Sequence, residues 1–308
     1  MDGLQSALDP AGVDATSIAR LSWVLFAGGV TIFVLVTLLT LLALSEKYRP
    51  YWLTGPRFIL GAGLIFPTAI LAGLLVYGLM LTRDQSAEAP AHALRIDVTA
   101  ELYWWRVRYR LNGRDVDTAN EIHVPVGMPV EVTLRSADVI HSFWVPALAG
   151  KLDTIPGTVN RLTLTATRPG IYRGQCAEFC GASHAWMAFR VVAVDPAEFE
   201  TWLARQTAPA RIPVSPVEMT GHGLFLAAGC GGCHTIRGTP ANSTIGPDLT
   251  HVGSRIGIAA DTLPNDAASL AHWIRDTQHI KPGNRMPAFR IFGDAELAAL
   301  ATYLASLE

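Results

Sequence analysis

Two long apolar runs stand out in the first part of the chain. Residues 21–45 and residues 58–82 contain no charged side chain. As helices, at about 1.5 Å per residue, both are long enough to cross a hydrocarbon core of about 30 Å. A buried core helix is usually shorter, and the start MDGLQSALDP carries acids but none of the basic residues of a signal peptide. The pattern therefore predicts two transmembrane helices.

Apolar and polar residues alternate in the next part of the chain, from Arg95 to about Val194. Such alternation predicts strands that bury one face. The alternating apolar positions are Ile96, Val98, Ala100, Leu102 and Trp104; Ile122, Val124 and Val126; Val130, Val132 and Leu134; and Leu162 and Leu164. Short strands at this spacing are typical of a β-sandwich or barrel.

Turn residues separate these runs at Asn112–Gly113, Gly127 and Pro169–Gly170. The first alternation changes phase near Trp104 and Trp105, where the apolar positions switch from even to odd numbers. A β-bulge produces such a change, so the pattern predicts one here.

The last third of the chain has a helical character. Residues 204–216, ARQTAPARIPVSP, are rich in Ala and Pro without periodicity, which predicts a semi-rigid linker. Beyond it, a C-terminal helix is expected, with Asp294 as its N-cap. Its apolar face consists of Leu297, Leu300, Ala301, Leu304 and Leu307.

Charge gives the orientation of the two helices. The segment between the apolar runs holds Lys47, Arg49 and Arg57 against Glu46 alone, and the first 19 residues hold acids and no base. Because short basic loops stay in the cytoplasm, both termini and everything after Arg83 are expected outside it. The formal net charge of −2 gives no indication of a nucleic-acid partner.

Two of the four cysteines, Cys230 and Cys233, are followed directly by His234 in the motif CGGCH. This is the attachment motif of c-type haem, in which two thioethers hold the porphyrin and the histidine is the proximal iron ligand. A disulfide is the usual alternative in an exported domain. A zinc site is disfavoured, because no second Cys/His pair follows at zinc spacing.

The second axial ligand of such a haem has to come from elsewhere in the chain. Met286 is the best candidate, since it lies in the irregular segment RMPAF before the final helix. A single methionine is more often core packing. His251, His272 and His279 are the rivals, because a haem with two histidine ligands is also compatible with this sequence.

The other two cysteines lie in the segment CAEFCGASHAWM, which brings together Cys176, Cys180, His184 and Met187. His141 lies upstream in DVIHSFW. Thiolates and thioethers select copper, and a His/Cys/Met set on a β-scaffold is typical of an electron-transfer copper site. Two cysteines would let both sulfurs bridge two coppers, with the two histidines as terminal ligands. A disulfide is again the alternative.

This order of motifs resembles subunit II of the haem-copper cytochrome c oxidases. The resemblance rests on SADVIHSFWVPAL, KLDTIPGTVN and CAEFCGASHAWM, while GCGGCH, TIGPDLTHVGSR and MPAF resemble the class I cytochrome fused to some bacterial members. It implies a multidomain membrane protein with a two-helix transmembrane hairpin, an all-β cupredoxin-like sandwich or barrel and an all-α class I cytochrome c domain. The expected boundaries are 1–20 for the extracytoplasmic start, 21–45 and 58–82 for the transmembrane helices, 46–57 for the cytoplasmic loop, 93–203 for the copper domain, 204–216 for the linker and 217–308 for the cytochrome.

The resemblance also implies roles for individual residues. The copper A ligands would be His141, Cys176, Cys180, His184, Met187 and the backbone carbonyl of Glu178. The carboxylate of Glu178 would reach a magnesium at the interface with subunit I. Asp153 matches a nearby acid of the family, expected to support the ligands from behind. Pro247 would offer its carbonyl to the proximal His234.

The implied function is electron delivery to a bacterial terminal oxidase (EC 7.1.1.9). Electrons would pass from haem c to copper A and on to subunit I, which reduces oxygen to water with proton pumping. Further expected partners are subunit III, an upstream cytochrome or bc-type complex, and membrane lipid. The expected location is the bacterial inner membrane, with the redox domains on the periplasmic side. The alternatives are an equivalent subunit of a nitric oxide reductase and a non-catalytic structural subunit.

Two positions depart from the family pattern. Tyr103 takes the place of a tryptophan that receives electrons from a docked cytochrome, and it is followed by Trp104 and Trp105. These three aromatics form a candidate docking patch, although alternation has to bury at least one of the tryptophans in the sandwich. Leu60 stands where the family often has a glutamate at a proton-channel entrance, so the resemblance does not carry that role to this chain.

Overall fold

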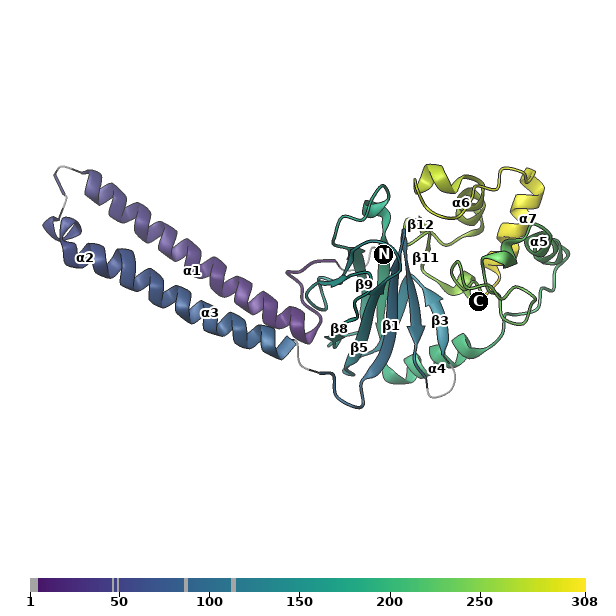
Figure 1. Cartoon of the computed structure of the whole chain (residues 1–308), viewed down its shortest axis with the longest axis horizontal. Coiled ribbons are helices and arrows are strands. Elements are labelled where there is room, and N and C mark those ends of the chain that lie inside the picture. Colours follow the sequence, from purple (N-terminus) through teal and green to yellow (C-terminus); the bar gives the residue numbers. More distant parts are fainter. Residues whose placement is uncertain (1–4, 46, 49, 86–87, 112–114) are drawn as a thin grey trace. The chain divides into compact units, whose positions relative to one another are not determined.

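The structure is a computed structural model that describes residues 5–45, 47–48, 50–85, 88–111 and 115–308. It divides into two compact units (Figure 1). One unit is Thr16–Glu88, and the other combines the start of the chain with Ala89–Glu308.

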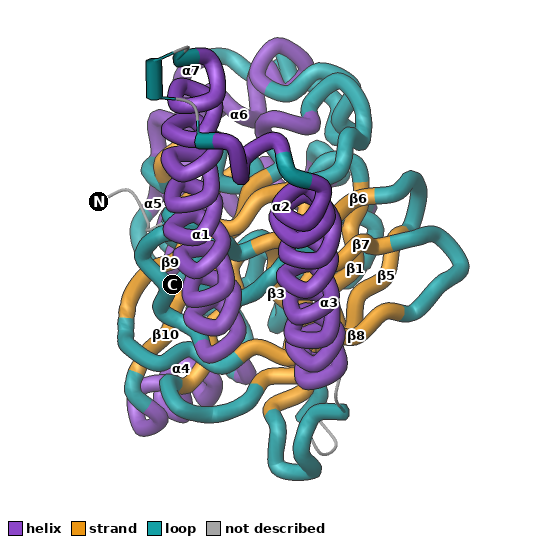
Figure 2. Tube along the Cα trace, turned by 90° about the vertical axis from the view of Figure 1, so that its left-hand side faces the viewer, coloured by secondary structure: helices purple, strands orange, loops and turns teal. Residues whose placement is uncertain are grey.

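Two long apolar helices make up the first unit and lie side by side (Figure 2). Helix α1 spans Val13–Leu44. The second helix consists of α2 (Pro56–Leu60), a π-turn (Gly61–Ile65) and α3 (Phe66–Gln85), after a short 3₁₀ turn at Tyr51–Thr54. In both helices, no residue of the most apolar 18-residue stretch is buried. Exposing this much apolar surface to water would cost a large amount of free energy, so such surfaces are suited to lipid.

The helices are longer than the uncharged runs that predict them. Helix α1 begins at Val13 rather than at residue 21, because helical backbone hydrogen bonding extends beyond the uncharged run. The π-turn precedes Pro67, which has no N–H to donate to an earlier carbonyl. Leu60, the position of the missing glutamate, is exposed at the end of α2. Glu46 and Arg49, used above to orient the helices, lie outside the described residues.

A β-sandwich of two five-stranded sheets follows (Figure 1). One sheet has the order β3-β2-β1-β5-β8 and the other β4-β10-β9-β6-β7. The strands are β1 (Leu94–Glu101), β2 (Trp104–Tyr109), β3 (Val116–Ala119), β4 (Glu121–Pro125), β5 (Val130–Ser136), β6 (His141–Trp144), β7 (Leu152–Thr154), β8 (Asn160–Leu164), β9 (Gly170–Cys176) and β10 (Ala188–Val194).

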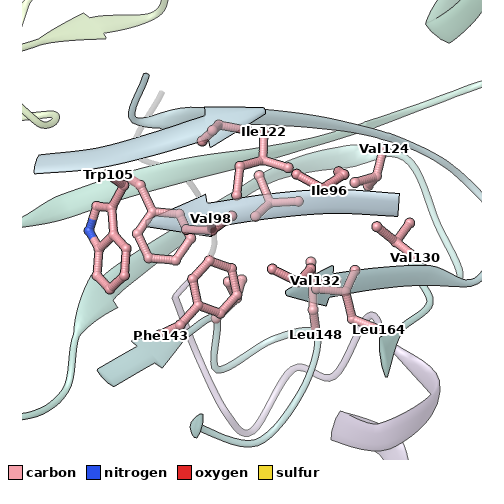
Figure 3. Close-up of a cluster of buried hydrophobic side chains, with 14 of the residues drawn as sticks. Ile96, Val98, Trp105, Ile122, Val124, Val130, Val132, Phe143, Leu148 and Leu164 are labelled. Carbon is pink, nitrogen blue, oxygen red and sulfur yellow. The ribbon is translucent and has the colours of Figure 1, made fainter. Parts of the chain in front are cut away.

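The inner faces of the two sheets form the core (Figure 3). The alternating residues of the sequence are its main contributors, since Ile96, Val98, Val130 and Val132 are all fully buried. The start of the chain also belongs to this unit, because Ala11 N donates to Ala147 O at 2.7 Å. The β-sandwich predicted from the alternation is therefore confirmed.

The predicted β-bulge at Trp104–Trp105 is wrong. The chain reverses direction after Glu101, and β1 and β2 pair as antiparallel strands with Glu101 opposite Trp104. The phase changes because the turn between the strands takes up two residues, Leu102 and Tyr103. Of the other expected turns, Gly127 adopts a left-handed φ of 79° between β4 and β5, and Asn112–Gly113 lies outside the described residues.

Helix α4 (Pro196–Thr207) continues into the segment predicted as linker. Proline in its first turn is already set for helix, and Phe199 and Leu203 are spaced to pack together on the sandwich, where both are buried. The alanines that suggested a linker are good helix formers and do not end the helix. The extended connection therefore begins at Ala208 rather than at residue 204.

The cytochrome part contains three main helices and one short hairpin. They are α5 (Pro216–Ala227), α6 (Ala267–Ile280) and α7 (Asp294–Ala305), with β11 (Gly257–Ile258) and β12 (Leu263–Pro264). The predicted apolar face of α7 is buried. Its N-cap is Gly293 rather than Asp294, because Glu296 Oε2 accepts the Gly293 N–H at 2.9 Å and so completes the first turn one residue earlier.

Helices α5 and α7 cross at Gly221, which gives a stability prediction. A Cβ at Gly221 would lie 2.2 Å from Ala299 O, so Gly221→Ala is expected to destabilise the cytochrome part by about 1–3 kcal/mol. Gly223 is the matched control, since nothing lies within 4 Å of its Cβ position and alanine favours helix. Thermal unfolding of the two variants measures the difference. Equal melting temperatures would mean that the close crossing is incorrect.

Candidate metal centres

Sulfur and nitrogen atoms gather at one end of the β-sandwich. His141 begins β6, Cys176 ends β9, and the loop from Cys176 back to β10 carries Cys180 and His184. The two Sγ atoms lie 3.8 Å apart. His141 Nδ1 lies 3.8 Å from Cys176 Sγ, and His184 Nδ1 lies 3.5 Å from Cys180 Sγ. Each sulfur thus has one imidazole beside it.

Two further donors complete the cluster. Met187 Sδ lies 3.9 Å from Cys180 Sγ, and the backbone carbonyl of Glu178 lies 3.2 Å from Cys176 Sγ. All six ligands expected from the sequence are therefore brought together. The two cysteines are free thiols in the structure, which disfavours the disulfide alternative.

The charge state of the sulfurs fits a cationic occupant. A hydrogen bond from Cys180 lowers the pKa of Cys176 to about 4. The pKa of Cys180 is raised because it is the proton donor to that thiolate, and burial adds to the effect. The second sulfur therefore ionises readily only if positive charge lies between the two. Two coppers would supply that charge, and the soft, largely buried donor set suits them.

Asp138 orients the imidazole of His141 and was missed by the sequence reasoning. Its Oδ1 lies 2.8 Å from His141 Nε2, which leaves Nδ1 facing Cys176. Its Oδ2 accepts the Leu102 N–H at 2.8 Å. Carboxylates that hold the far nitrogen of a ligating histidine are a common support in metal sites. The acid three residues before His141 was the available signal.

Glu178 and Asp153, the acids expected near the copper ligands, lie on either side of Lys151. Lys151 Nζ is 3.2 Å from Asp153 Oδ1 and 3.9 Å from Glu178 Oε2. The side chains of the two acids are 38% and 47% exposed, so both face solvent in this chain. Asp153 also pairs across the sheet with Ser142, the neighbour of His141.

A second site lies in an apolar pocket of the cytochrome part. Its lining includes Cys230, Cys233, His234 and Met286, together with Phe225, Trp273, Leu300 and Leu304. Cys230 and Cys233 lie in and just after a 3₁₀ turn that follows α5. The two cysteines expected to attach haem c and both expected iron ligands thus open onto one largely apolar cavity, as a porphyrin requires.

The histidine expected as proximal ligand is held by a backbone carbonyl. His234 Nδ1 donates to Pro247 O at 2.8 Å, the contact that the family resemblance implies. A Cβ at Gly246 would lie 2.7 Å from the His234 ring, so only glycine allows the ring this position. Burial lowers the pKa of His234, which keeps the imidazole in the neutral form that binds iron.

The Met286 segment is held by its backbone. Met286 N donates to Asn284 Oδ1 at 2.8 Å. Met286 O accepts from Thr277 Oγ1 at 2.9 Å and from Gln278 Nε2 at 3.0 Å. These bonds tie the irregular segment to α6 and keep the thioether at the pocket.

The three rival histidines are occupied elsewhere or point to solvent. Both ring nitrogens of His251 contact carbonyls, those of Glu308 at 3.2 Å and Ala208 at 3.1 Å. His272 and His279 are exposed on α6. Among the described residues that line the pocket, His234 is the one histidine, so the geometry favours Met286 as the second axial ligand.

The three aromatics of the proposed docking patch have different surroundings. Trp105 is fully buried in the sandwich, next to Phe143 (Figure 3). Its ring also packs against Phe189. Trp104 is half-buried, with the Arg106 guanidinium 4.7 Å from its ring centroid. Tyr103 is 6% exposed and, like Trp104, lines the pocket of the cytochrome part. The expectation that at least one tryptophan is core is therefore confirmed.

Fold and sites together define a chain with two candidate metal centres, a copper-type donor set on a β-sandwich and a haem c attachment motif in a helical domain. Two family models match it: cytochrome c oxidase subunit II, periplasmic domain, over residues 107–194, and cytochrome c over residues 219–308.

Relatives with similar sequences support the same assignment. The chain is 38% identical over 226 residues to cytochrome c oxidase subunit 2 of Alkalihalophilus pseudofirmus, covering 73% of this chain and 65% of the relative. It is 30% identical over 282 residues to cytochrome c oxidase subunit 2 of Bacillus subtilis, covering 86% of this chain and 78% of the relative. The chain belongs to the cytochrome c oxidase subunit II family.

The matches differ in extent. The chain spans 65% of the A. pseudofirmus protein and 62% of the Bacillus sp. strain PS3 protein, to which it is 34% identical over 69% of its own length. Among solved structures, the periplasmic domain of subunit II of cytochrome oxidase from Bradyrhizobium japonicum is 33% identical. That match has a TM-score of 0.36 and covers 39% of this chain and all of the other.

Proposed function

We propose that this chain is the subunit through which electrons enter a bacterial haem-copper terminal oxidase. They would pass from the haem c site to the copper A site and on to a catalytic subunit I, which reduces oxygen to water and pumps protons. The observation that carries the proposal is that one chain holds both a paired-sulfur cluster with two imidazoles and a CGGCH pocket with a facing methionine.

The proposed metal ligands are those collected by the fold. Two coppers would be held by His141, Cys176, Cys180, His184, Met187 and the carbonyl of Glu178. Cys230 and Cys233 would attach the haem, with His234 and Met286 on its iron. When bound, each centre takes up and releases one electron at a time.

The protein's contribution to such a relay is to hold the ligands still. Asp138 fixes the His141 ring, and Pro247 fixes that of His234. His141, Cys176, Cys180 and Met187 are all at most 7% exposed, so water is largely kept from the sulfurs. Rigid ligands and a dry site limit the rearrangement that accompanies a change of charge.

Partners and location complete the proposal. Subunit I and subunit III would share the bacterial inner membrane with the two apolar helices, and an upstream cytochrome or bc-type complex would supply electrons. The redox domains would lie on the periplasmic side. Glu178 would reach a magnesium at the interface with subunit I, since its half-exposed carboxylate lies at the surface beside Lys151. A purely structural subunit or a nitric oxide reductase subunit is supported by no separate feature of this chain.

The test of this proposal is metal stoichiometry. We expect the full-length chain, purified in detergent, to contain two coppers and one haem that stays on the polypeptide in a denaturing gel. The proposal assigns all four cysteines of the sequence to these two sites. Elemental analysis and haem staining measure both values. One copper per chain, or haem released by denaturation, would contradict the assignment.

A further inference from the structure

The segment that carries Met286 contacts residues that lie next to the copper ligands. Ser183, the buried neighbour of His184, donates through Oγ to Pro282 O at 2.7 Å. On the other side, Arg285 Nη2 lies 3.4 Å from Asp138 Oδ2, whose second oxygen holds His141. Ser183 is adjacent to one copper ligand, and Asp138 is hydrogen-bonded to another. Both contact the segment just before the haem ligand Met286.

Lys281 is buried at the same boundary, with 2% of its surface exposed. Its Nζ donates to Tyr103 O of the copper domain at 2.7 Å and to Ala259 O of the cytochrome at 3.0 Å. Burial lowers its pKa to about 7, and either protonation form has enough N–H groups for both carbonyls. A buried amine is tolerated only while its hydrogen bonds are made, so separating the domains here would be costly.

Tyr103 is enclosed by two loops, the copper loop at Gly181 and the segment of the cytochrome at Gly283. A Cβ at Gly181, next to Cys180, would lie 2.7 Å from Tyr103 Oη, and one at Gly283 would lie 3.6 Å from it. Tyr103 and Trp104 also line the haem pocket. The copper domain therefore forms part of the pocket wall, and the edge where the family places a docking tryptophan is covered by the chain's own cytochrome.

A second contact lies at the turn of the β11–β12 hairpin, beside the sandwich (Figure 1). Ala259, Ala260 and Asp261 all have left-handed φ values, 52°, 58° and 59°, a conformation that non-glycine residues keep only where their surroundings impose it. The turn places Asp261 Oδ1 2.8 Å from Arg190 Nε on β10. Asp261 Oδ2 is also 3.5 Å from Arg173 Nε on β9.

The same hairpin reaches the copper loop. Thr262 Oγ1 donates to Ala259 O at 2.7 Å and lies 3.2 Å from Trp186 O, next to Met187. Just before the hairpin, Ile256 N donates to Glu121 Oε2 at 2.8 Å. With a side chain only 6% exposed, Asp261 is a desolvated acid between two arginines, and loss of its partners would leave a buried charge unpaired.

We propose that the cytochrome domain is held on the copper domain in one fixed position, with Lys281 and Asp261 as the positioning residues. This rests on the proposed function. In that position the haem pocket faces the copper site across Tyr103 and the 281–286 segment, so electron transfer within the chain needs no domain movement. Outside donors meet the haem domain and do not reach the covered Tyr103 edge.

The distance between the two oxidised centres tests the fixed position. The probe is the full-length holoprotein in detergent, with pulsed dipolar EPR between copper A and the low-spin ferric haem. We expect one narrow distance distribution in the unmodified chain. Lys281→Met and Asp261→Asn, made separately, should broaden it while copper content and both optical spectra stay unchanged. Arg275→Gln is the control, since its partner Asp294 has a side chain that is 93% exposed.

The rate of haem-to-copper electron transfer is the second readout. After flash reduction of the haem, we expect a rate in the unmodified chain that does not change with salt or solvent viscosity. Either variant should slow it about tenfold or more, because a merely tethered domain has to find its docked position by diffusion. A broad distribution in the unmodified chain, or variants like the control, would overturn the fixed position alone. Absence of copper A from a folded chain would overturn the proposed function as well.

Discussion

Cys180→Ser is expected to destroy the paired copper site while leaving the haem in place. The two sulfurs lie 3.8 Å apart, and each has its own imidazole, so both are needed to hold two metals between them. A serine hydroxyl is a harder donor that ionises far less readily than a thiol, and it gives a poor copper bridge. Copper should fall from two per chain to one or none, and electron transfer from haem to copper should be lost.

Elemental analysis and the EPR signal of the oxidised copper site measure this effect. Thr154→Ser is the matched control. Thr154 is fully buried and pairs across the sheet with His141, yet it supplies no ligand. The control should keep both coppers. If Cys180→Ser also kept two coppers with an unaltered EPR signal, Cys180 would not be a bridging ligand.

Met286→Ala is expected to change the haem without releasing it. Attachment depends on Cys230 and Cys233, whereas Met286 faces the pocket from a separate segment and would form only the second axial bond. Its loss should convert the iron toward high spin, or to a water-ligated form, and lower the reduction potential. A thioether ligand raises the potential of a haem, so removing it has the opposite effect.

The absorption spectrum and a redox titration of the haem provide the measurement. Met219→Ala is the control, because Met219 lies in the same domain but is 52% exposed on α5. It should leave both properties unchanged. An unaltered spectrum in Met286→Ala would transfer the axial role to another residue. His279 is then the next variant to make, and its exposed position means that α6 would have to shift to bring it to the iron.

The proposed arrangement also predicts an order of electron flow. Because Tyr103 is buried against the haem pocket, a donor protein is expected to dock on the haem domain rather than at Tyr103. The proposal thus accounts for the absence of the family's tryptophan at position 103. The backbone carbonyl of Tyr103 binds Lys281, and its ring fills the space beside Gly181. Tyr103 therefore has a packing role at this position.

Local motifs made most of the site predictable. The spacing in CGGCH and CAEFCGASHAWM places several candidate ligands within a turn or a single loop, so residue type and short separation already indicate the chemistry. The charge-free runs and the strand alternation work in the same way, because each reflects the surroundings of one element. The prediction of a bulge was wrong because a strand reversal and a bulge both shift the phase of the alternation. Only the pairing of Glu101 with Trp104 distinguishes them.

The sequence alone was enough to predict the candidate ligands, the two apolar helices and the β-then-α order of domains. The contacts between distant segments became visible only in the folded chain: Asp138 with Arg285, Asp261 with Arg190, and Lys281 with Tyr103, which is 178 residues away. Nothing in the neighbourhood of an isolated lysine indicates which carbonyl it will meet. Such a bond forms only when two folded surfaces come together, and the free energy of that packing depends on every group they bury.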